Sequence, residues 1–72
     1  MAGEETELHL GWACQCFRLA RIAARVGARR TAEELGGLGD EFIGTAVSLG
    51  ATDLAVRRAK AGLFLIVGAG VA

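Results

Sequence analysis

Two cysteines and one histidine are the residues of this chain best suited to bind a metal or to carry redox chemistry. Cys14 and Cys16 are separated by one residue, and His9 lies shortly before them. On a helix, residues two apart point about 200° away from each other, so two thiolates at this spacing cannot share one ion. A lone Cys-x-Cys pair also falls short of the four ligands of a structural zinc site. We therefore predict no metal and no cofactor. We expect Cys16 to be a small buried residue and His9 to form a surface pair with Glu5.

Catalysis by proton transfer or nucleophilic attack needs a reactive group beside a second group that activates it. The chain has one histidine and one serine, Ser48, and neither belongs to a spacing typical of such a pair. We therefore predict no catalytic residue and expect the protein not to be an enzyme.

Arginines recur at three- and four-residue steps in the first half of the chain. The stripe consists of Arg18, Arg21, Arg25 and Arg29. On a continuous helix, these four side chains fall within an arc of about 80°. Such a stripe could bind phosphate, an anionic lipid or an acidic partner, or it could be a solvated face that meets the glutamates which follow in the sequence. Few aromatic residues interleave with the arginines, which gives nucleic-acid binding weak support.

The last twelve residues, 61–72, carry no charged or polar side chain. They are too few to span a bilayer, which takes roughly 20 apolar residues in a helix. We expect a second subunit, another protein or one leaflet of a membrane to cover this tail. In the membrane alternative, the contact runs through residues 57–72, with Arg57, Arg58 and Lys60 at the headgroups and the tail in the acyl region. The predicted interaction residues of the tail are Leu63, Phe64, Leu65, Ile66 and Val67.

Residues 63–72 resemble the first strand and glycine turn of a dinucleotide-binding Rossmann unit. The third glycine of that motif is missing, and so is the helix on which the pyrophosphate rests. The resemblance therefore implies no cofactor. It does leave a strand added to a partner's sheet as an alternative for the tail. We predict a helix there, because the tail continues a helical pattern that starts at Asp53.

Size and composition favour association. A chain of 72 residues with 11 glycines forms one domain with a small core, and such domains often gain stability by oligomerisation. The formal net charge is zero, which gives no overall attraction to nucleic acid or to a membrane surface. Two cysteines do not make a disulfide framework, so we expect the cytoplasm or another reducing compartment, with a membrane-peripheral location as the alternative.

Three helices are predicted, over residues 5–28, 32–49 and 53–70. Thr6 or Gly3 could cap the first helix, and the spacing of Thr31 and Glu34 is typical of a capping box at the second. Gly50 is a natural end for the second helix, and Thr52 can begin the third. Three glycines could interrupt the second helix, namely Gly36, Gly37 and Gly39.

The predicted fold is all-α. Residues 1–72 form a single small domain, a helical hairpin or three-helix arrangement whose apolar tail packs in an oligomer or against a partner. We expect a structural or assembly subunit of a homo-oligomer, a filament or a larger complex. The alternatives are a membrane-associated accessory subunit that inserts its tail, and a small adaptor that docks the arginine stripe on an acidic protein surface or on nucleic acid.

Overall fold

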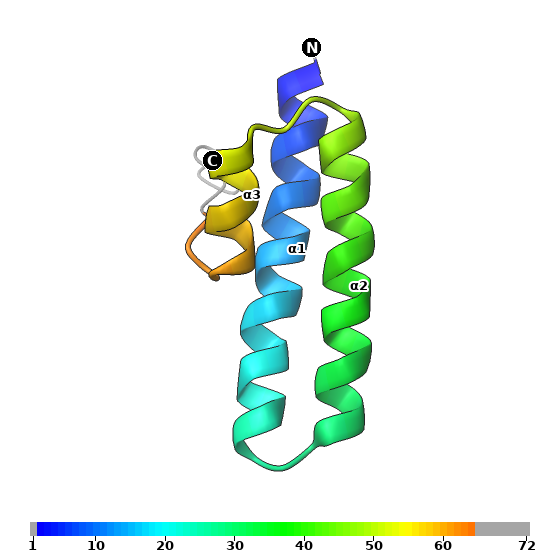
Figure 1. The fold of residues 1–72 in the computed structure, drawn as a ribbon, viewed down its shortest axis with the longest axis vertical. Coiled ribbons are helices and arrows are strands. Elements are labelled where there is room, and N and C mark those ends of the chain that lie inside the picture. The colour runs from blue at the N-terminus through cyan, green and yellow to red at the C-terminus, as the bar shows by residue number, and fades with distance from the viewer. Residues whose placement is uncertain (1, 65–72) are drawn as a thin grey trace, which may run out of the picture.

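A computed structural model describes residues 2–64, and the all-α prediction is confirmed for them. The helices are α1 (Ala2–Arg25), α2 (Arg29–Ser48) and α3 (Asp53–Lys60). α1 and α2 form a long antiparallel hairpin, and the short α3 packs beside α1 on the side away from α2 (Figure 1). No strand occurs within residues 2–64.

α1 ends at Arg25, three residues before the predicted end at residue 28, because the chain turns at Gly27. This glycine has a φ of +83°, a conformation that side chains with a Cβ rarely adopt. The N–H of Gly27 donates to the Ala24 carbonyl at 3.2 Å, and the N–H of Ala28 donates to the Ala23 carbonyl at 2.8 Å. These two bonds form a Schellman motif, which satisfies carbonyls that a helix end leaves unpaired.

α2 begins at Arg29, before the residue 32 predicted for it, so the capping-box prediction is wrong. Thr31 already lies inside the first turn, and the residue at the N-cap is Ala28, which makes no side-chain capping bond. The helix then runs unbroken to Ser48 through the three glycines that could have interrupted it. The predicted stop at Gly50 is confirmed by its φ of +103° and by its bond from the N–H to the Val47 carbonyl at 3.0 Å.

α3 begins where it was predicted but ends at Lys60 instead of residue 70. At its start, the side chain of Thr52 accepts a hydrogen bond from the Ala55 N–H at 3.2 Å. At its end, Gly62 adopts a φ of +77° and closes a Schellman motif like that at Gly27, in which the N–H of Leu63 donates to the Arg58 carbonyl at 2.8 Å. Residues 65–70 lie outside the described part of the chain.

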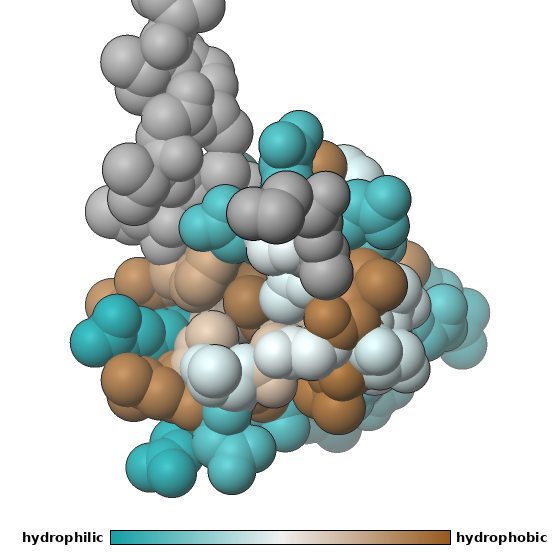
Figure 2. All heavy atoms as spheres, turned by 90° about the horizontal axis from the view of Figure 1, so that it is seen from above, coloured by the Kyte–Doolittle hydropathy of each residue, from teal (hydrophilic) through white to brown (hydrophobic). Residues whose placement is uncertain are grey.

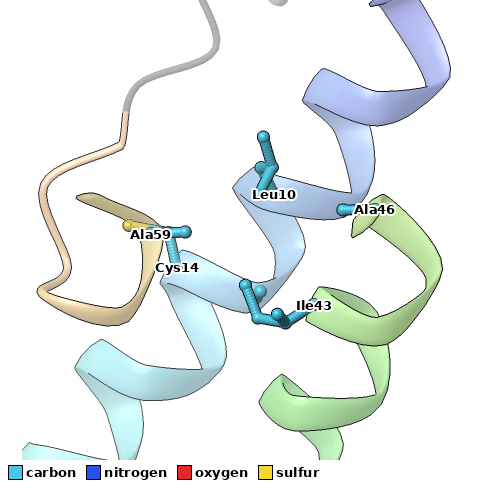
Figure 3. Close-up of a cluster of buried hydrophobic side chains, with 6 residues drawn as sticks. Leu10, Cys14, Ile43, Ala46 and Ala59 are labelled. Atoms are coloured by element: carbon cyan, nitrogen blue, oxygen red, sulfur yellow. The ribbon is translucent and has the colours of Figure 1, made fainter. Parts of the chain in front are cut away.

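The core is thin and rich in small side chains. Its buried members are Leu10, Ala13, Cys14, Ile43, Ala46 and Ala59 (Figure 3). Because most of these side chains are small, the three helices can approach one another closely, but each contact buries little apolar area. Thr6 is also buried and donates a hydrogen bond from its hydroxyl to the Leu49 carbonyl at 3.3 Å. It therefore joins α1 to the end of α2. The expectation that Thr6 or Gly3 caps α1 is wrong, since α1 begins at Ala2.

Candidate functional site

One side of the helical hairpin carries large apolar side chains that nothing in residues 2–64 covers. We call this surface the apolar face. It consists of Trp12 and Leu19 of α1, Val26 directly after the end of α1, and Leu38 and Phe42 of α2. The four residues other than Phe42 are 44–75% exposed, and Phe42 is half-buried. Uncovered groups of apolar side chains on a small protein mark interaction sites.

Sequence spacing places the α1 members of the apolar face in one line. Trp12, Leu19 and Val26 follow one another at seven-residue steps, which return to nearly the same side of a helix. Cys14 lies about 200° around α1 from Trp12 and packs in the core with Ala59 of α3. The apolar face is therefore on the side of the hairpin opposite α3.

An aromatic cluster joins the two helices at one end of the apolar face. The ring centroids of Trp12 and Phe42 are 5.6 Å apart, and those of His9 and Trp12 are 5.1 Å apart at an interplanar angle of 69°. Such edge-on contacts are favourable geometries for aromatic rings. Beside them, Trp12, Gln15, Cys16 and Phe42 line an open groove of about 420 Å³. The groove is almost free of polar atoms, since Gln15 is the one lining residue with a strongly polar side chain.

His9 does not make the predicted side-chain pair with Glu5. Its Nδ1 donates to the main-chain carbonyl of Glu5 at 2.8 Å, and its ring packs against Trp12. This bond fixes the orientation of the imidazole ring at the edge of the aromatic cluster.

The arginine stripe is divided between two helices. Arg18, Arg21 and Arg25 remain together on α1, whereas Arg29 belongs to α2 and lines a separate hollow with Glu33 near the α1–α2 turn. The three α1 arginines surround a second hollow of about 490 Å³, which we call the arginine hollow. Its lining comprises Arg18, Arg21, Ile22, Arg25, Gly62 and Leu63.

Arg21 holds the end of α3. Its Nη2 donates to the Lys60 carbonyl at 2.7 Å, and its Nη1 donates to the Ala61 carbonyl at 3.0 Å. A cation at this position also interacts favourably with the negative end of the helix dipole. The two bonds join parts of the chain that are 40 and 39 positions apart in the sequence. Instead of the expected continuation of α3, residues 61–64 form a turn that faces α1.

The described part of the chain includes two of the five predicted interaction residues of the tail. Leu63 is exposed at the rim of the arginine hollow, and Phe64 is half-buried against the core of its own chain. Leu65, Ile66 and Val67 lie outside the described residues.

Both cysteines are buried and neither forms a disulfide. Burial raises the pKa of the Cys16 thiol, because the low-polarity surroundings disfavour the thiolate. Cys16 is thus the small buried residue that the sequence predicted. Within residues 2–64, no group of three or more metal-binding side chains comes together.

Polar and apolar side chains alternate over the end of the molecule that Figure 2 presents, where brown apolar atoms reach the surface between teal polar ones. Among α1, α2 and α3, none is both long and apolar enough to cross a bilayer. The chain matches no family model, and no curated protein or solved structure was found to be similar to it.

Sequence reasoning missed the apolar face as a unit. The signal was the seven-residue repeat of Trp12, Leu19 and Val26, a spacing typical of a seam between two paired helices. Leu38 and Phe42, at a four-residue step, continue the surface on α2.

Proposed function

We propose that this protein is a small structural subunit that assembles with further copies of itself through the apolar face. The observation that carries the proposal is the uncovered line of Trp12, Leu19 and Val26 beside Leu38 and Phe42. The proposed role is non-enzymatic, and the surface that performs it is a packing surface.

The size of the apolar face supports pairing of two copies. From their exposed fractions, Trp12, Leu19, Val26 and Leu38 leave roughly 400 Å² of side-chain surface uncovered, which is within the range of the largest patch on a monomer. An interface is usually about 60% apolar, so this patch corresponds to roughly 650 Å² per subunit. That area lies at the low end of a standard interface, about 600–1,000 Å² per partner.

A second copy is the occupant that fits this surface best. A two-fold axis brings the same face of two copies together, so one contact covers both apolar faces at once. The α1 part of the face is uncharged from Trp12 to Val26, with Cys16 and Ala23 between them on the same side, and the chain has zero net charge. On the α1 side of the face, and in the net charge of the chain, no charge repulsion therefore opposes self-association.

The test is the molar mass in solution of the full chain and of two variants that carry the same substitution. Leu19→Glu places a carboxylate within the apolar face, and Leu54→Glu places one on α3, away from it. The two leucines are similarly exposed, at 49% and 56%, so both variants should fold equally well as single chains. Circular dichroism of both variants checks this.

We expect light scattering coupled to size exclusion to show a dimer or larger assembly for the full chain and for Leu54→Glu, and a monomer for Leu19→Glu. The substitution acts once in each copy, so the lost burial of two half-exposed leucines weakens a dimer by about 2 kcal/mol or roughly 30-fold, before the added cost of the carboxylate. A full chain that remains monomeric at every concentration would reject the proposal. Equal dissociation in both variants would show that assembly uses another surface.

A further inference from the structure

We propose that the arginine hollow binds a phosphate group carried on an apolar molecule, with the phosphomonoester headgroup of an anionic lipid as the ligand that fits it best. The hollow lies between α1 and the turn after α3 and combines three guanidinium groups with two exposed apolar side chains. It is distinct from the apolar face, so this inference is independent of the proposed self-assembly.

The geometry of the hollow is fixed by backbone contacts. Arg21 is held by its bonds to the Lys60 and Ala61 carbonyls, and a Cβ at Gly62 would lie 2.7 Å from its Nη1 and 2.9 Å from Cγ of Arg18. The glycine therefore allows the backbone to approach both arginines. The side of the hollow formed by Arg21 and the turn at Gly62 is consequently arranged before a ligand arrives, which lowers the entropy lost on binding there.

Arg18 and Arg25 supply charge that the protein itself does not neutralise. They lie three residues before and four residues after Arg21, on the same side of α1. Within residues 2–64, neither forms an ion pair with a carboxylate. Like charges at these spacings repel one another, and a polyvalent anion would remove this repulsion.

Guanidinium groups suit a phosphate in particular. Each guanidinium presents several N–H donors in a planar fork that can bind two phosphate oxygens at once. The last turn of α3, whose Lys60 carbonyl Arg21 binds, carries three further exposed cations, namely Arg57, Arg58 and Lys60. The positive charge around the hollow is thus concentrated, although the net charge of the chain is zero.

Two apolar side chains at the hollow favour a phosphate on an apolar molecule over a free ion. Ile22 and Leu63 both line the hollow and are both exposed. At a membrane surface, arginines bind headgroups while neighbouring apolar side chains enter the acyl boundary. The volume of about 490 Å³ also exceeds what a single small anion needs, since a water molecule takes up about 30 Å³.

The experiment compares the full chain with two double variants that remove equal charge. Arg18→Gln with Arg25→Gln alters the hollow and keeps Arg21 to hold α3, whereas Arg29→Gln with Arg30→Gln alters α2 near the turn. Binding is measured by co-sedimentation with vesicles of phosphatidylcholine alone and with vesicles that also contain phosphatidic acid. In parallel, glycerol 3-phosphate is titrated while the amide signals of Arg21, Gly62 and Leu63 are followed by NMR.

We expect the full chain to bind vesicles that contain phosphatidic acid and not vesicles of phosphatidylcholine alone. Loss of Arg18 and Arg25 should weaken that binding roughly 30-fold, because each arginine contributes about 1 kcal/mol at an anionic surface. The variant that lacks Arg29 and Arg30 should bind these vesicles much more tightly than the variant that lacks Arg18 and Arg25. Glycerol 3-phosphate should shift the three amide signals, and its affinity for the protein should be lower than that of the lipid.

Three outcomes would contradict the proposal in different ways. Equal losses in the two double variants would show general charge attraction and overturn a specific site. Amide shifts with glycerol 3-phosphate but no vesicle binding would keep the phosphate chemistry and overturn the lipid as its source. No binding of either probe would overturn the site altogether.

Discussion

Alanine at Gly39 should destabilise the protein although alanine is the better helix former. Gly39 is buried where α2 passes α1, and a Cβ there would lie 2.8 Å from Cζ of Phe17 and 3.0 Å from both of its Cε atoms. Carbon atoms pack best at about 3.5 Å or more, so the Phe17 ring or the helix must move by about 0.7 Å. Gly37, two residues earlier in α2, is exposed and has no atom within 4 Å of the equivalent position.

The two glycines form a matched pair in which the helix-propensity term cancels. Either substitution by alanine gains about 1 kcal/mol of helix propensity, and only Gly39→Ala also incurs overpacking, which costs about 1–3 kcal/mol. Gly37→Ala should therefore be more stable than Gly39→Ala by about 1–3 kcal/mol. For a domain of this size, each kcal/mol shifts the Tm by about 4–8 °C.

Thermal unfolding followed by circular dichroism measures the difference, at one fixed protein concentration because assembly also changes the Tm. Replacing Phe17 by leucine removes the ring, and in that background Gly39→Ala should stabilise nearly as much as Gly37→Ala. A Tm of Gly39→Ala equal to or above that of Gly37→Ala, in the chain with Phe17, would refute the close α1–α2 contact.

Three further substitutions examine the helix ends and the core. Thr52→Ala should cost about 1 kcal/mol, visible as faster hydrogen exchange at the Ala55 amide, and unchanged exchange would contradict the cap. Gly62→Ala should cost at least about 1 kcal/mol, because it strains a positive φ and displaces Arg21, and a Tm equal to that of the unaltered chain would refute this. Because burial raises the pKa of Cys16, the unfolded thiol ionises first, so the free energy of unfolding should fall as the pH rises above the ordinary cysteine pKa of about 8.5. Chemical denaturation at several pH values should show a smaller alkaline loss in Cys16→Ala.

The helical content and two helix boundaries could be predicted because their signals are local. Thr52 begins α3 through a bond to a residue three positions on, and Gly50 ends α2 through a turn of its own neighbours. Both belong to residue types with known preferences for these positions, so no knowledge of the rest of the fold was needed.

The end of α3 could not be predicted in the same way, because it depends on contacts distant in the sequence. The apolar residues after Lys60 extend a helical pattern, but Arg21 reaches across from α1 to bind the carbonyls of Lys60 and Ala61. Gly62 is nevertheless a local signal for the end of a helix, because glycine is favoured just after the last helical turn.

The arginine stripe is shorter than predicted because α1 ends at Arg25. Gly27 turns the chain two residues after Arg25, so Arg29 leaves the stripe and only Arg18, Arg21 and Arg25 remain together. The capping box at Thr31 was wrong for the same reason, since α2 begins directly after the turn at Gly27. One glycine therefore accounts for both differences.

Fluorescence of Trp12 on dilution is the most direct test of self-assembly through the apolar face. Trp12 is the single tryptophan of the chain and is 45% exposed in one subunit, so its emission reports directly on whether a second copy covers the face. We predict that the emission maximum moves to longer wavelength as the protein is diluted and that the change disappears in Leu19→Glu, which should emit at the longer wavelength throughout. An emission maximum that is constant over dilution and the same in both proteins would contradict the account.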